Sequence, residues 1–205
     1  MNTNSKDTDW AWIAGFMDGD GCFTCSVLEM VSKKNGLHSI TIGPRVMASQ
    51  QEKWRHVLDH LVELTGCGKV YTKHEKSNRL NSSIQCMWTV GKFKEIEFVC
   101  KNILPFIYHK KRQCKILMRL VQERMKDKNG LNRVKNERVP KEATKRSAKL
   151  ALALNSDTTT GRNSRWNNVE KRTWEYWDKR IDEVYAEADE YFSIPFIERL
   201  RKLRK

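Results

Sequence analysis

The chain has 205 residues, enough to bury a core in one domain or in one domain with an appendage. Its 39 Lys and Arg outnumber its 25 Asp and Glu, and the formal net charge of +14 indicates a polyanionic partner, with nucleic acid as the leading candidate and a merely soluble basic protein as the alternative. No stretch approaches the roughly 18 consecutive apolar residues of a membrane span, so we expect a soluble intracellular protein, whether organellar, viral or cytoplasmic.

Apolar periodicity predicts an α+β domain over residues 1–125, with a helix, two strands, a helix, two strands and then helices. The predicted elements are helices over 8–19, 51–64, 93–104 and 110–125 and strands over 23–28, 39–46, 69–74 and 83–90. Pro44 predicts a bulge or an edge in the second strand. The helix over 51–64 is expected to bury an apolar stripe that begins at Trp54 and continues through Val57, Leu58, Leu61 and Leu64.

The remaining residues differ in character from this domain. We expect a basic linker or loop over 126–168, with a short helix over 150–154, because basic and turn-forming residues dominate it. A last helix and basic tail occupy 169–205, and the apolar stripe of that helix, which runs from Trp174 to Ala188, is expected to dock on the main domain. The predicted divisions are therefore 1–125, 126–168 and 169–205.

Residues 13–21 read Ile-Ala-Gly-Phe-Met-Asp-Gly-Asp-Gly and lie at the end of the first predicted helix. Gly15 and Gly19 are one turn apart and Ala11 is one turn earlier, so they share a helix face that carries little side chain. Glycine inside a helix costs about 0.5 to 1 kcal/mol, and this cost favours close packing against another helix over a simple cap at Gly19.

Two carboxylates, Asp18 and Asp20, follow at the helix C-terminus, where the helix dipole disfavours negative charge by about 0.3 to 1 kcal/mol. A divalent cation would compensate, because hard ions such as Mg2+ prefer carboxylate and carbonyl oxygen. Taken alone, these acids would be read as solvated turn residues.

The whole segment, followed directly by a strand, resembles the motif of the LAGLIDADG homing endonuclease family, with Phe16 and Met17 as apolar substitutions. The resemblance covers about residues 10–125 and implies an αββαββα domain with an antiparallel four-stranded DNA-binding saddle. Because the motif occurs once, it implies a homodimer. The residues that the resemblance places in the dimer interface are Ala11, Gly15, Asp18 and Gly19.

The same resemblance implies a metal-dependent active site. Asp20 would be the metal ligand, assisted by the Gly19 carbonyl, and Lys110 would stabilise charge at the scissile phosphate, with Lys111 or Arg112 as substitutes. The metal would be Mg2+ or Mn2+, and Ca2+ could bind without supporting cleavage. The ion would polarise the phosphoryl oxygen and lower the pKa of a water molecule.

The chain departs from the family pattern after the second strand. Ala48 and Glu52 stand where Gln and Arg are expected to organise water. A small shift would give that role to Gln50, which we therefore include as a catalytic candidate, with Lys53 beside it.

Outward residues of the sheet are the expected DNA readers, because base edges in the major groove present distinguishable patterns of donors and acceptors. They are Thr24, Ser26, Ser39, Thr41, Arg45, Tyr71, Lys73, Gln85 and Thr89. The resemblance thus implies an intron-encoded homing endonuclease that makes a double-strand break in a long pseudo-palindromic DNA site. The alternatives are an intron RNA maturase and a non-cleaving, sequence-specific DNA-binding protein.

Overall fold

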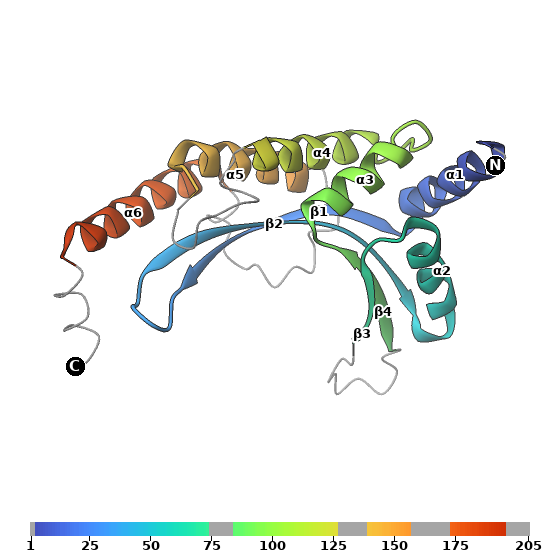
Figure 1. The fold of residues 1–205 in the computed structure, drawn as a ribbon, viewed down its shortest axis with the longest axis horizontal. Helices are drawn as coiled ribbons and strands as arrows, with labels where there is room; N and C mark the ends of the chain where they lie inside the picture. The colour runs from blue at the N-terminus through green and yellow to red at the C-terminus, as the bar shows by residue number, and fades with distance from the viewer. Residues whose placement is uncertain (1–2, 74–83, 127–138, 157–172, 196–205) are drawn as a thin grey trace. The chain divides into compact units, whose positions relative to one another are not determined.

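A computed structural model describes residues 3–73, 84–126, 139–156 and 173–195. The predicted α+β class and the predicted order of elements are confirmed (Figure 1). In chain order the elements are α1 (Thr3–Gly19), β1 (Gly21–Val31), β2 (His38–Gln51), the short 3-10 helix η1 (Glu52–Trp54), α2 (Arg55–Thr65), β3 (Lys69–Lys73), β4 (Gln85–Val90), α3 (Phe93–Ile103), α4 (Lys111–Lys126), α5 (Lys141–Ser156) and α6 (Trp174–Ser193).

The four strands form one sheet in the order β1-β2-β4-β3. Both β2 and β3 pair with β4 in the antiparallel sense, with Ala48 and Val70 each opposite Trp88. The chain divides into two compact units: the first comprises residues 1–25 and 44–125, and the second comprises residues 26–43 and 126–205. Each unit is described by itself below.

The strands alternate as predicted. On β1 the buried residues Phe23, Cys25 and Val27 alternate with half-buried neighbours, and β2 buries every second residue from Ile42 to Ala48. This alternation continues through Pro44. The ladder between β2 and β4 begins only at Val46, so Pro44 lies beyond it, where a missing N–H removes no hydrogen bond to β4.

The core of the first unit includes Trp88, which is completely buried and donates its indole N–H to the carbonyl of Cys67 at 2.9 Å. Helices α3 and α4 bury apolar stripes at helical spacing, which consist of Ile96, Val99, Cys100, Ile103, Cys114, Leu117, Leu120 and Val121. In the described parts of the chain, no helix is both long enough and apolar enough to cross a membrane.

The expected burial of Trp54 is wrong, since this side chain is 49% exposed. Residues 52–54 form the 3-10 helix η1, and α2 starts only at Arg55. The α-helical periodicity that places Leu58 and Leu61 in the core therefore does not extend back to Trp54.

In the second unit, α5 and α6 are joined by polar contacts. The Tyr185 hydroxyl contacts the Val139 carbonyl and Thr144, whose Oγ1 lies 2.7 Å away, and the Lys145 ammonium lies 2.8 Å from both Asp178 and Asp182. Within this unit α6 therefore packs on α5.

The sequence prediction for this region needs a correction. Residues 141–156 form the helix α5, not a linker with a short helix over 150–154. The buried residues Ala143, Ser147 and Ala151 recur every four positions. Such small side chains allow close helix packing, but they do not form a recognisable apolar stripe in the sequence. The helix was therefore not predicted from this basic segment. The proposed divisions at 126 and 169 stay a prediction.

Candidate active site

The chain passes from α1 into β1 within one residue. The N–H of Asp20 donates to the Phe16 carbonyl at 2.9 Å, and β1 begins at Gly21. A Cβ atom at Gly21 would lie 2.6 Å from the Met17 carbonyl oxygen, so only glycine fits this turn. The tight connection holds the exposed carboxylate of Asp20 at the junction of helix and strand.

Gln50 reaches this junction from β2. Its Nε2 donates to Oδ2 of Asp20 at 2.6 Å. Ala48, in contrast, is buried in the core with 2% exposure. Ala48 therefore cannot contact Asp20 with a polar group, and Gln50, two residues later on β2, makes this contact instead.

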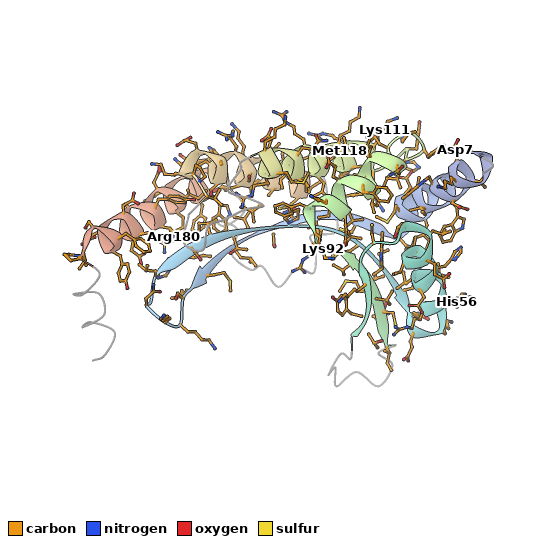
Figure 2. All side chains as sticks on the ribbon, viewed as in Figure 1. Asp7, His56, Lys92, Lys111, Met118 and Arg180 are labelled. Carbon is orange, nitrogen blue, oxygen red and sulfur yellow. The ribbon has the colours of Figure 1, made fainter. Side chains whose placement is uncertain are left out.

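Lys110 brings a positive charge to the C-terminus of α1. Its ammonium donates to the carbonyl oxygens of Met17, Gly19 and Gly21 at 3.0, 3.1 and 2.8 Å. This cation compensates the negative end of the helix dipole, where the acids of the motif gather. Lys111 and Arg112, the two proposed substitutes, are exposed at the start of α4, where Figure 2 labels Lys111.

Asp18 fixes the segment that carries Lys110. Its carboxylate accepts backbone hydrogen bonds from Tyr108, His109 and Lys110 at 2.7, 3.2 and 2.9 Å. Partial burial raises the pKa of Asp18, but the three backbone donors outweigh it and bring the pKa below its ordinary value of 3.8. Asp18 therefore anchors the backbone directly before α4 within its own chain, and its role in a dimer interface stays a prediction.

We expect Asp18→Ala to lower the free energy of unfolding by about 1 to 3 kcal/mol at pH 7, because the three backbone N–H groups of residues 108–110 lose their acceptor. The folded-state pKa of Asp18 is depressed, so this stabilisation is present above the ordinary pKa of 3.8 and disappears as the pH falls through the folded-state value. Urea unfolding between pH 7 and pH 3 should show the two proteins converging at the acidic end. A difference that stays constant across this range would contradict the anchoring role of the Asp18 carboxylate.

The donor set fits a hard divalent cation. The Asp20 carboxylate and the Gly19 carbonyl offer oxygen ligands, which Mg2+ prefers together with water and substrate phosphate. Among the described residues no group of three or more His, Cys, Asp or Glu could hold a metal ion. The fit is therefore to an open site that is completed by other ligands, and not to a closed metal site within one chain.

The predicted interface face of α1 is bare. Ala11, Gly15 and Gly19 are exposed. A Cβ atom added at Gly15 or Gly19 would meet no described atom within 4 Å outside the helix's own backbone and the neighbouring residues. Trp12, on the same helix, is also exposed. The structure thus brings Asp20, Gln50 and Lys110 together and places the small-residue face beside them on α1.

The proposed DNA readers all lie on the outward positions of the strands. Thr24, Ser26, Gln85 and Thr89 are half-buried, whereas Ser39, Thr41, Arg45 and Tyr71 are exposed, and Lys73 is the last residue of β3. The strand register places two further outward positions beside these readers. Lys69 lies opposite Thr89, and Met87 lies opposite both Ser49 and Tyr71. Each lies two residues from a proposed reader on its own strand, Lys69 from Tyr71 and Met87 from both Gln85 and Thr89.

Comparison with known proteins places this geometry in context. The family model described as LAGLIDADG endonuclease matches residues 13–113. DNA endonuclease I-CvuI of Chlorella vulgaris is 24% identical over 122 residues, which cover 59% of this chain and 69% of the relative. DNA endonuclease I-CreI of Chlamydomonas reinhardtii is 25% identical over 123 residues, which cover 60% of this chain and 68% of that relative.

Solved structures extend the likeness in fold. The structure of I-CvuI in complex with its target in the presence of Ca aligns with a TM-score of 0.66 and 16% identity, covering 89% of this chain and 98% of that one. The archaeal intron-encoded I-Vdi141I complexed with DNA aligns with a TM-score of 0.64 and 20% identity, covering 88% and 99%. Because the fold likeness covers 89% of the chain, it includes part of the region after residue 125.

Proposed function

Because the chain belongs to the LAGLIDADG endonuclease family, we propose that it is a sequence-specific homing endonuclease that makes a double-strand break in a long pseudo-palindromic DNA site. The observation that carries this proposal is the meeting of Asp20, Gln50 and Lys110 at the end of α1. A carboxylate, a water-organising amide and a cation are the groups that phosphodiester hydrolysis needs around the scissile phosphate.

In this proposal each residue around Asp20 has a separate role in the reaction. Gln50 orients the Asp20 carboxylate through its 2.6 Å hydrogen bond, and its amide oxygen is then available to a water molecule. Lys110 is held by carbonyls on both sides of Asp20, so its positive charge lies where a phosphate would approach that carboxylate. Asp18 holds the backbone of Lys110 in place.

Asp20, together with the Gly19 carbonyl, would hold a divalent metal ion. When bound, Mg2+ would polarise the phosphoryl oxygen and lower the pKa of a coordinated water molecule. The structure of the relative I-CvuI was determined in the presence of Ca, an ion of the same hard, oxygen-preferring class.

A homodimer would provide one Asp20 for each of the two cuts. The sequence has one motif copy and therefore one Asp20 per chain, whereas two scissile phosphates lie on opposite strands. The bare face formed by Ala11, Gly15 and Gly19 allows two copies of α1 to approach closely and bring both Asp20 residues together. The outward face of the strands would then read one half-site per subunit in the major groove.

Cleavage of a randomised duplex library tests this function. The purified protein is incubated with the library and Mg2+, and the new DNA ends are sequenced, with EDTA in place of the metal as the control. We expect paired breaks within one pseudo-palindromic sequence, and none with EDTA. Selection of a duplex without any breaks would support a non-cleaving DNA-binding protein instead, and binding of structured RNA alone would support the maturase alternative.

A further inference from the structure

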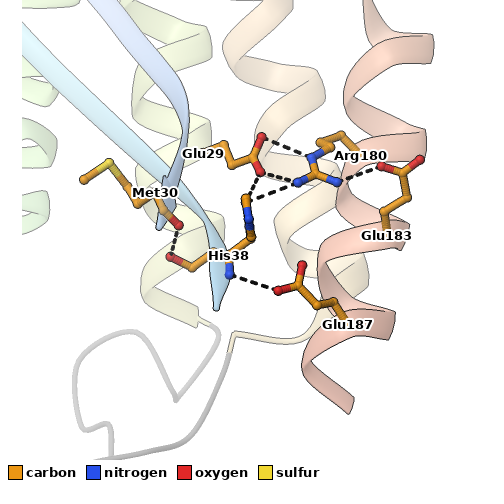
Figure 3. A network of polar contacts seen from close by, with 7 residues as sticks. Glu29, Met30, His38, Arg180, Glu183 and Glu187 are labelled. Carbon is orange, nitrogen blue, oxygen red and sulfur yellow. Dashed lines mark hydrogen bonds and ion pairs between the residues drawn. The ribbon is translucent and has the colours of Figure 1, made fainter. Parts of the chain in front are cut away.

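The tip of the hairpin formed by β1 and β2 is tied to α6 within the second unit. We define the hairpin tip as residues 26–43. Arg180 on α6 donates from Nε to Oε2 of Glu29 at 3.0 Å and also contacts Oε1 of Glu29, while its third nitrogen donates to Glu183 at 2.8 Å (Figure 3). The Arg180 guanidinium therefore binds the Glu29 carboxylate through two nitrogens. Glu183, which lies on the same helix as Arg180, fixes the orientation of the guanidinium.

The second strand of the hairpin joins the same network. The ring nitrogen Nδ1 of His38 contacts Glu29 and lies 3.2 Å from the Arg180 guanidinium. The backbone N–H of His38 donates to the Glu187 carboxylate of α6 at 3.5 Å (Figure 3). Both strands of the tip are thus bound to one helix. We call these contacts of Glu29, His38, Arg180 and Glu187 the α6 tie.

The tie is partly shielded from water. The side chains of Arg180, Glu29 and His38 are 23%, 20% and 32% exposed. The hydrogen bonds from Arg180, above all, outweigh the opposing effect of burial and bring the pKa of Glu29 to about 2. The Glu29 carboxylate is therefore ionised throughout the physiological pH range.

The hairpin tip needs such support. The ladder between β2 and β4 covers only Val46 to Gln51, so the tip has no β4 strand beside it. A two-stranded hairpin by itself is marginally stable, and packing against a helix is one of the ways in which it becomes ordered. Here α6 supplies that packing through the α6 tie.

The tie acts from the side of the hairpin opposite its proposed reading face. Glu29 continues the inward series Cys25 and Val27, and His38 continues the inward series of Ile42, whereas Ser39 and Thr41 point outward. α6 itself is poorly suited to bind phosphate, because it carries Lys179 and Arg180 against a larger acidic set, Glu175, Asp178, Asp182, Glu183, Glu187, Asp189 and Glu190.

We propose that Arg180 is a positioning residue for DNA recognition, which holds the hairpin tip through Glu29 and His38 so that Ser26, Ser39 and Thr41 meet the bases from a fixed orientation. The proposal rests on the proposed function, because it assigns a role in reading DNA. It gives α6 a part in specificity without any contact between that helix and the nucleic acid.

The test compares Arg180→Gln with Arg119→Gln. The control also removes one positive charge and breaks an arginine pair, that of Arg119 with Glu123 on α4. In the DNA-free protein, we expect amide hydrogen exchange over the hairpin tip to accelerate at least about tenfold in Arg180→Gln only. For the duplex recovered from a randomised library, affinity should fall about tenfold and base preference at the tip-contacted positions should relax, with the salt dependence of binding unchanged.

Three outcomes would overturn the proposal. Unchanged hydrogen exchange in the tip, with a salt slope reduced by about one, would make Arg180 a phosphate contact instead. Unchanged base preference despite faster exchange would make the tie purely structural. If Arg180→Gln does not fold, Arg180→Lys decides, because lysine keeps the charge but cannot bind bidentately, and wild-type exchange and specificity in that variant would refute the role.

The failure of the proposed function would look different. If the wild-type protein selects no duplex from the library, the endonuclease proposal fails whatever Arg180 does. The exchange measurement on DNA-free protein still reports whether the α6 tie orders the hairpin tip.

Discussion

Asp20→Asn should abolish double-strand cleavage, with a rate loss of about 10³-fold or more, while duplex binding stays within about threefold of wild type. The substitution removes the negative charge with which the proposed site holds a divalent cation, and it changes the side-chain shape very little. The Asn oxygen can still accept the hydrogen bond that Gln50 donates at 2.6 Å. The fold at the end of α1 should therefore survive, because it depends on Gly21 and on the backbone hydrogen bond to Phe16.

Single-turnover cleavage of the library-selected duplex with Mg2+ measures the first quantity, and fluorescence anisotropy with Ca2+ measures the second. Asp189→Asn is the matched control, because it makes the same substitution at an exposed acid on α6, in the second compact unit and outside the proposed site. It should cleave at nearly the wild-type rate. If Asp20→Asn cleaves as fast as this control, Asp20 is not the metal ligand and the proposed chemistry is wrong.

Local periodicity carried most of the fold prediction. The alternation along β1 and β2 and the helical spacing on α3 and α4 depend on neighbours within one or two turns, and they place Phe23, Val46 and Leu117 inside. Asp20 could be identified because the helix, the glycines and the strand that position it are contiguous in the sequence.

Contacts between distant residues could not be predicted in this way. The bonds from the 108–110 backbone to Asp18, and those from Arg180 to Glu29, join residues that are about 90 and 151 positions apart. No sequence pattern near either residue of a pair indicates that the two are in contact. The start of α5 at Lys141 was missed for a related reason. Its buried alanines can be recognised as a packing face only when the position of α6 is known.

Gly15→Leu should leave the single chain folded and prevent it from forming a dimer. A Cβ atom at Gly15 would meet no described atom within 4 Å outside its immediate surroundings, so the larger side chain has room in one subunit. Replacement of a helix-interior glycine also favours the helix by up to about 1 kcal/mol. In a dimer built on two touching α1 helices, however, two leucines would occupy the space where the backbones meet, and overpacking costs about 1 to 3 kcal/mol for each.

The dimer dissociation constant should therefore rise by about 30-fold to 10⁴-fold, and double-strand cleavage should be lost with it. Sedimentation equilibrium measures the association, and thermal unfolding checks that the subunit is intact. Gly91→Leu is the matched control, because Gly91 is exposed, lies between β4 and α3, and also has no described atom within 4 Å of an added Cβ. A Gly15→Leu protein that dimerises and cleaves like this control would show that the bare face of α1 is not the interface. The two Asp20 carboxylates would then have to be brought together by another surface, or each strand would have to be cut by an independent subunit.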